Sequence, residues 1–201
     1  MIKKIAIFGS TGSIGKTLIE ILKKDKKNIE IILLTAKKNY KEIIKQTKIF
    51  KVKNLIITNK ESFQIIKNKF KKKNINVYND FNSINKIFNK KRIHYTMNAI
   101  SGLAGLDPTL KIIKYTKNIA IANKEAIICG WSLINNNLKR FKTKFIPIDS
   151  EHFSIWSLIN ETKNENIEKV FITASGGPFI NYSLKKFKTI TPKLALNHPN
   201  W

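Results

Sequence analysis

The sequence predicts an α/β fold built on a doubly wound, Rossmann-like parallel sheet that is followed by a second domain. Short apolar stretches alternate with stretches of helical spacing through about residue 145. Such alternation is typical of a parallel sheet covered by helices on both faces. A glycine-rich turn, Gly9 to Gly15, lies between the first strand and the first helix. After Lys144 the pattern changes to short polar motifs, which indicates a domain boundary there.

Each element follows from its local pattern. The first strand, Lys3 to Phe8, precedes a helix from Ser13 to Lys24. Further strands are expected at Ile29 to Thr35, Asn54 to Thr58, Ile75 to Tyr78, His94 to Asn98 and Asn118 to Ala122. Helices are expected at Tyr40 to Phe50, Glu61 to Lys71, Leu106 to Tyr115 and Lys124 to Asn137. We assign residues 1–145 to the first domain and residues 146–201 to the second, which includes a strand at Lys169 to Thr173.

The net charge of +25 raises the question of a nucleic-acid partner, because lysines neutralise phosphates. The basic residues are spread along the chain, outside any aromatic or zinc-ligand pattern, and lysine is accompanied by many isoleucines and asparagines, as AT-rich codon drift would produce. We therefore expect no specific nucleic-acid partner, only loose adhesion to RNA. The apolar runs are too short for a membrane span, so we expect a cytoplasmic protein with no membrane partner. Cys129 is expected to be a small core residue.

The turn from Gly9 to Gly15 predicts a dinucleotide site. Glycines at this spacing let the chain turn tightly, approach a pyrophosphate and pack the helix on the sheet, with the helix N-terminus facing the anion. NAD-binding folds usually end the second strand with an acidic residue that binds the ribose hydroxyls. Here that strand is followed by Lys37 and Lys38, which could pair with a 2′-phosphate. The residues therefore favour NADPH over NADH.

Two later segments carry further candidate chemistry. Asp149 and Glu151 flank Ser150 after an apolar stretch, and two carboxylates at this spacing suit Mg²⁺ or Mn²⁺. The alternative is that Asp149 or Ser150 caps a helix. Ser175 opens a Ser-Gly-Gly-Pro-Phe segment that either cradles a phosphate or is an ordinary turn.

Five segments together resemble 1-deoxy-D-xylulose 5-phosphate reductoisomerases across the whole chain. They are Gly9-Ser-Thr-Gly-Ser-Ile-Gly15, Ala122-Asn-Lys-Glu125, Pro147-Ile-Asp-Ser-Glu-His152, Ser175-Gly-Gly-Pro-Phe179 and Asn197-His-Pro-Asn-Trp201. Enzymes of this family rearrange 1-deoxy-D-xylulose 5-phosphate and reduce the product with NADPH to 2-C-methyl-D-erythritol 4-phosphate, an isoprenoid precursor of the non-mevalonate pathway. The resemblance also implies a divalent ion, Mg²⁺, Mn²⁺ or Co²⁺, and a homodimer for full-length members.

The resemblance implies a role for each matching residue. Those implied to bind the cofactor are Ser10, Thr11, Gly12, Ser13, Ile14, Lys38, Asn39, Asn123, Lys124 and Glu125. Those implied to bind metal are Asp149 and Glu151, and those implied to bind substrate are Ser150, Glu151, Ser175, His198 and Trp201. Lys124, Asp149, Glu151 and His198 are the candidate catalytic residues. One departure is Lys37, where the family often has glycine.

The resemblance also implies parts that follow Trp201 in the family: a third metal carboxylate, further phosphate ligands and a helical C-terminal domain. We therefore expect a truncated start of an α+β catalytic domain, and a 201-residue chain that binds NADPH but turns over little or no substrate. Two alternatives stay open. One is another NADP-linked enzyme, such as a semialdehyde or homoserine dehydrogenase. The other is a non-catalytic NADPH-binding remnant or a basic nucleotide- or RNA-binding protein.

Overall fold

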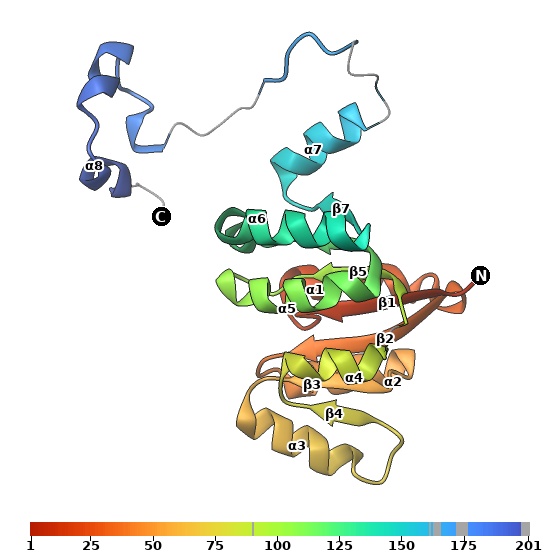
Figure 1. Ribbon diagram of the computed structural model, residues 1–201. Helices are drawn as coiled ribbons and strands as arrows, with labels where there is room; N and C mark the ends of the chain where they lie inside the picture. Colours follow the sequence, from red (N-terminus) through yellow and green to blue (C-terminus); the bar gives the residue numbers. More distant parts are fainter. Residues whose placement is uncertain (90, 161, 163–165, 172–176, 198–201) are drawn as a thin grey trace. The chain divides into compact units, whose positions relative to one another are not determined.

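A computed structural model describes residues 1–89, 91–160, 162, 166–171 and 177–197. The chain divides into two compact units, Met1–Trp156 and Ser157–Trp201. The first unit is an α/β layer structure around one parallel sheet (Figure 1). Its strands are β1 Lys3–Phe8, β2 Ile29–Ala36, β3 Asn54–Ile57, β4 Asn76–Tyr78, β5 Ile93–Asn98, β6 Thr116–Ile121 and β7 Lys144–Pro147. Its helices are α1 Ser13–Lys23, α2 Tyr40–Phe50, α3 Lys60–Phe70, α4 Ile84–Phe88, α5 Leu106–Ile112, α6 Lys124–Phe141 and the start of α7 Ser150–Ile159.

The strand order makes the sheet doubly wound, as predicted. The order is β4-β3-β2-β1-β5-β6-β7, and every neighbouring pair is parallel. From β1 the chain therefore builds outward in one direction to β4, then returns to β5 on the other side of β1. The loops after β1 and β5 diverge at this switch point, which is where open α/β sheets bind their ligands.

Alternation along the strands fills a core on each face of the sheet. Ile5 and Ile7 of β1 pack in one apolar cluster with residues of α1, α2 and α3. Ala6 and Phe8 of the same strand pack in the other cluster, with residues of α4, α5 and α6. Because successive strand residues point to opposite faces, a continuous apolar strand is what this two-sided burial requires.

Most predicted elements match in type and lie within a few residues of their predicted ends. The predicted helix Leu106 to Tyr115 ends as an α-helix at Ile112 and continues as the 3₁₀ turn Ile113–Tyr115. The sequence reading missed α4, which has five residues and follows the 3₁₀ turn Phe81–Ser83. Such short elements carry too little periodicity to be recognised.

Cys129 is exposed, so the prediction of a core residue is wrong. The buried stripe of α6 consists of Ala126, Gly130, Ile134 and Leu138, and Cys129 lies one position outside it. The buried residues recur every four positions, as expected for a helix that packs one face on the sheet.

The second unit has short helical elements: 3₁₀ turns at Gly177–Phe179 and Leu184–Thr189, and α8 Pro192–Leu196. The strand predicted at Lys169 to Thr173 is not formed at residues 169–171, and its last two residues lie outside the described residues. An isolated strand leaves its backbone groups without ladder partners, which is a physical reason for this difference. The proposed domain boundary at residue 145 stays a prediction. In the described parts of the chain no helix has both the length and the apolarity to cross a membrane.

Candidate functional site

A cleft of about 520 Å³ opens at the carboxyl ends of β1, β2, β3 and β5, at the switch point of the sheet. It is lined by Gly9, Thr11, Gly12, Thr35, Ala36, Lys37, Thr58, Phe81, Ala99, Ile100, Ser101 and Ala104. The predicted glycine turn therefore lines the cleft between the end of β2 on one side and the segment after β5 on the other. A cleft of this size at this position is typical of a cofactor site.

Each of the three glycines in the turn has its own structural reason. Gly9 adopts a left-handed φ of +70°, and a Cβ there would lie 2.7 Å from the carbonyl oxygen of Ala99. A Cβ on Gly15 would lie 2.6 Å from the Cα of Ser10, so close packing of α1 excludes a side chain. At Gly12 φ is −75°, and a Cβ would approach the Gly9 oxygen only to 3.4 Å. The protein itself thus tolerates a side chain at Gly12, and the space beside it is left open for a ligand.

The N-terminus of α1 can accept an anion. The helix begins at Ser13, its N-cap Gly12 has no side chain, and its first turn holds no acidic residue. Gly12, Ser13 and Ile14 are exposed, and Thr11 is half-buried beside them. The first backbone N–H groups of a helix lack intrahelical acceptors and lie at the positive end of its dipole. These predicted cofactor residues therefore lie at an exposed helix N-terminus, a place that suits an anion.

Ser10, also predicted to bind the cofactor, is placed differently from its neighbours. Its side chain is fully buried, and its hydroxyl donates a hydrogen bond to the Thr35 carbonyl oxygen at 3.3 Å. The structure therefore uses the Ser10 side chain inside the protein, where it ties the turn to β2.

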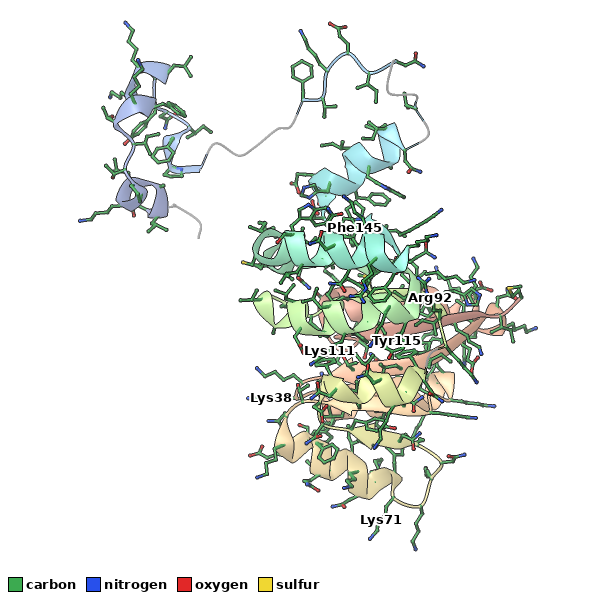
Figure 2. All side chains as sticks on the ribbon, viewed as in Figure 1. Lys38, Lys71, Arg92, Lys111, Tyr115 and Phe145 are labelled. Atoms are coloured by element: carbon green, nitrogen blue, oxygen red, sulfur yellow. The ribbon has the colours of Figure 1, made fainter. Side chains whose placement is uncertain are left out.

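The segment after β2 carries two neighbouring lysines, Lys37 and Lys38, of which Figure 2 labels Lys38. Lys37 lines the cleft, and both side chains are exposed. Their backbone is fixed by α3, because Asn59 N–H donates to Lys37 O at 3.2 Å and Ser62 Oγ donates to Lys38 O at 2.9 Å. Asn39 caps α2 by accepting a hydrogen bond from Glu42 N–H at 3.1 Å.

The segment after β5, Ala99 to Ala104, forms a further wall of the cleft beside the glycine turn, and the sequence analysis missed it. Asn98 shapes it by donating to Gly105 O at 2.8 Å, and Asn123 by donating to Ile100 O at 2.8 Å. Asn123 also accepts from Ala126 N–H and so caps α6, and its side chain is buried. The residues of this wall that line the cleft, Ala99, Ile100, Ser101 and Ala104, are uncharged and form no binding motif, and it is the pairing of β5 with β1 that brings them to the turn.

The two predicted catalytic or cofactor residues at the start of α6, Lys124 and Glu125, are exposed. They follow the buried cap Asn123 directly, at the carboxyl end of β6. The strand and cap therefore fix the backbone from which these two side chains extend.

The acidic segment after β7 starts a helix. Asp149 accepts a hydrogen bond from His152 N–H at 2.9 Å, so the helix-capping alternative is confirmed for this residue. Its Oδ2 also lies 2.7 Å from His152 Nδ1. Partial burial alone would raise the pKa of Asp149, but the hydrogen bonds and charge of His152 outweigh it and the pKa is lowered. The contacts with His152 therefore favour the ionised form of this carboxylate.

Ser150 and Glu151 are exposed in the first turn of α7. Within the described ranges no three His, Cys, Asp or Glu side chains gather closely enough to hold a metal ion. The predicted substrate residues Ser175, His198 and Trp201 lie outside the described residues.

Comparisons with known proteins agree with this geometry. The sequence profile of 1-deoxy-D-xylulose 5-phosphate reductoisomerase matches residues 5–130, and the profile of the C-terminal domain of the same enzyme matches residues 145–201. The 1-deoxy-D-xylulose 5-phosphate reductoisomerase of Pelagibacter ubique is 62% identical over 99% of this chain and 52% of its own length. That of Wolbachia pipientis is 36% identical over 99% of this chain and 51% of its own length. The chain thus spans about half the length of the curated relatives it matches.

Solved structures show the same similarity. The reductoisomerase of Zymomonas mobilis in complex with NADPH superposes with a TM-score of 0.79 and 28% identity, covering 98% of this chain and 52% of the other. A reductoisomerase in complex with NADPH, fosmidomycin and magnesium gives a TM-score of 0.76 and 26% identity, covering 100% and 52%. With a family profile that matches well over half of its residues, this chain belongs to the 1-deoxy-D-xylulose 5-phosphate reductoisomerase family.

Proposed function

We propose that the first unit binds NADPH and that the segment from Asp149 onward contributes metal and substrate ligands for the conversion of 1-deoxy-D-xylulose 5-phosphate to 2-C-methyl-D-erythritol 4-phosphate. The observation that carries the cofactor proposal is Gly12. Neither the backbone at this position nor the neighbouring protein atoms require a glycine, because φ is ordinary and an added Cβ would fit. Gly12 lies at an exposed helix N-terminus in the switch-point cleft, so the missing side chain leaves room for a ligand. Related proteins bound to NADPH support the same assignment.

The cofactor fits the residues in two parts. The pyrophosphate would lie on Thr11, Gly12, Ser13 and Ile14, where the helix N-terminus supplies N–H donors. The 2′-phosphate would lie near Lys37, Lys38 and Asn39, where two cations balance its charge. We expect Lys37, which lines the cleft, to take part together with Lys38.

The metal and substrate site would form around Asp149, Ser150 and Glu151. Carboxylate oxygens are the ligands that Mg²⁺ and Mn²⁺ prefer, and Asp149 and Glu151 each offer a carboxylate here. When bound, NADPH would supply a hydride and the divalent ion would supply positive charge for a developing oxyanion. The Ser150 hydroxyl would orient the substrate. Lys124 and Glu125 would hold the cofactor beside it.

Three residues outside the described ranges complete the proposal. Ser175 would bind the substrate phosphate, His198 would contact the substrate, and Trp201 would cover it and exclude water. We also propose a domain boundary near residue 145, a cytoplasmic location, and a homodimer for full-length members.

The test is NADPH oxidation by the purified 201-residue chain with 1-deoxy-D-xylulose 5-phosphate and Mg²⁺. We expect NADPH to bind and turnover to be slow or absent, because two carboxylates hold the ion weakly. Rapid turnover would contradict the expectation about this chain. Binding of RNA alone, lost at moderate salt and with no NADPH binding, would favour a basic RNA-binding protein instead.

A further inference from the structure

Gln46 of α2 is a buried polar residue that contacts the backbone of the glycine turn. It is 1% exposed, and its Nε2 donates a hydrogen bond to Ser10 O at 2.9 Å across 36 positions of sequence. The same nitrogen donates to Glu42 Oε1 at 3.0 Å. Its own Oε1 is buried and finds no hydrogen-bond partner among the described residues. A buried amide with one unsatisfied atom costs stability, so its retention needs a reason other than packing.

Thr35 of β2 holds the same turn from the sheet. Gly9 N–H donates to Thr35 Oγ1 at 2.9 Å, and Ser10 N–H donates to Thr35 O at 3.0 Å. The N–H groups of Gly9 and Ser10 are thus fixed by β2, whereas the carbonyl of Ser10 is fixed by Gln46. Lys37 and Lys38 lie in the short segment that connects β2 to α2.

The direction of the Ser10 carbonyl determines where the next N–H points. A trans peptide is planar, so the N–H of Thr11 points opposite to the Ser10 carbonyl. Gln46 draws that carbonyl toward α2 and the protein interior. The Thr11 N–H then faces away from Gln46, and Thr11 itself lines the cleft.

We infer that Gln46 is a positioning residue for the cofactor: through the Ser10 carbonyl it orients the Thr11 N–H for the pyrophosphate. It also ties this turn to the segment that carries Lys37 and Lys38. The inference rests on the proposed function, because it assumes that a dinucleotide phosphate occupies the turn. It adds a residue that does not line the cleft and that the family resemblance did not single out.

The first test compares Gln46→Leu with Thr47→Val. Thr47 is the next residue of α2 and is 2% exposed, and among the described residues its hydroxyl bonds within the helix, to Ile43 O at 2.6 Å. Each change removes a buried hydrogen bond to a backbone carbonyl, so the melting temperature is not the measurement that separates the two variants. Only Gln46→Leu should weaken NADPH binding, by about tenfold, because the Thr11 N–H is then no longer oriented toward the pyrophosphate and one hydrogen bond of ordinary strength to the cofactor is lost. Equal NADPH affinities in the two variants would overturn the inference.

The second test uses Gln46→Glu and NADP⁺, which is stable in mild acid. When protonated, the new carboxyl can donate to Ser10 O; when ionised, it faces that oxygen and the Glu42 carboxylate. The measured quantity is the ratio of the NADP⁺ affinity of Gln46→Glu to that of the unaltered chain at the same pH. This ratio should rise as the pH falls from about 8 to about 6. The same ratio for Gln46→Leu should stay flat. A flat ratio for Gln46→Glu would contradict the inference, whereas failure of the unaltered chain to bind NADPH would contradict the proposed function instead.

Discussion

The two units, Met1–Trp156 and Ser157–Trp201, differ in what their side chains bury. In the first, two clusters of apolar side chains fill both faces of the sheet. In the second, none of the described residues is buried. Phe171, Leu184 and Leu196 are 83%, 86% and 83% exposed. The first unit is thus stabilised by a core of its own, and the described part of the second is not.

This difference bears on how well each half of the proposed site is fixed. Burial of apolar area is the main favourable term in folding, and it also holds ligand-binding groups in place. The cofactor cleft lies on strand ends that two cores support. In the acidic segment, by contrast, the helix α7 has no buried residue. We therefore expect the first unit to bind its ligand without help from residues 157–201.

The largest expected effect comes from a pair of leucine truncations. Leu34 is fully buried in β2, and Leu34→Ala should lower the free energy of unfolding by about 2–5 kcal/mol. Leu184→Ala, its matched control in the second unit, should change it by less than about 0.5 kcal/mol. Chemical denaturation measures both. Similar losses for the two variants would mean that the second unit has a core as well.

Next in size is the effect of Gly12→Asp on the cofactor. A carboxylate at the N-terminus of α1 would repel the pyrophosphate, and we expect NADPH affinity to fall about a hundredfold. The melting temperature should change little, because a side chain fits at Gly12. Gly15→Ala is the contrasting control: its Cβ would meet the Ser10 backbone, so it should lower the melting temperature. Unchanged NADPH binding in Gly12→Asp would show that the glycine turn is not part of the NADPH site.

A smaller effect is expected for the double change Lys37→Glu and Lys38→Glu. It should weaken NADPH about tenfold and leave NADH almost unaffected, since only NADPH carries the 2′-phosphate. The matched control for the change in net charge is a second double change, Lys3→Glu and Lys117→Glu, at exposed lysines near the amino ends of β1 and β6. Isothermal titration with both nucleotides gives the comparison. An equal loss for NADH would show that the lysines act by general charge.

The smallest effect should follow removal of residues 157–201. The shortened chain keeps both clusters of the first unit, so its melting temperature and NADPH affinity should match those of the full chain. Scanning calorimetry and the same titration test this. A clear loss of stability would show that the second unit supports the sheet.

Much of the fold could be predicted because local signals agreed with the tertiary arrangement. The helix Tyr40–Phe50 appears with its predicted ends, since Asn39 caps its start and Lys51 ends it in a left-handed conformation. Cys129 was mispredicted because its apolar neighbours suggested burial, whereas the angular position on α6 decides it.

Part of the site could be predicted for the same reason, and part could not. The glycine turn combines a spacing with a place after the first strand, so it was recognisable. The wall from Ala99 to Ala104 and the contact of Gln46 with Ser10 depend on strand pairing and on a helix crossing the turn. No local pattern encodes such contacts between distant segments.

The central claim is that the switch-point cleft binds NADPH, and a fluorescence titration of the 201-residue chain with NADPH and, in parallel, NADH tests it most directly. We predict saturable binding that is tighter for NADPH, persists at moderate salt and is weakened about a hundredfold by Gly12→Asp. Absence of saturable binding, or binding that Gly12→Asp leaves unchanged, would contradict the account.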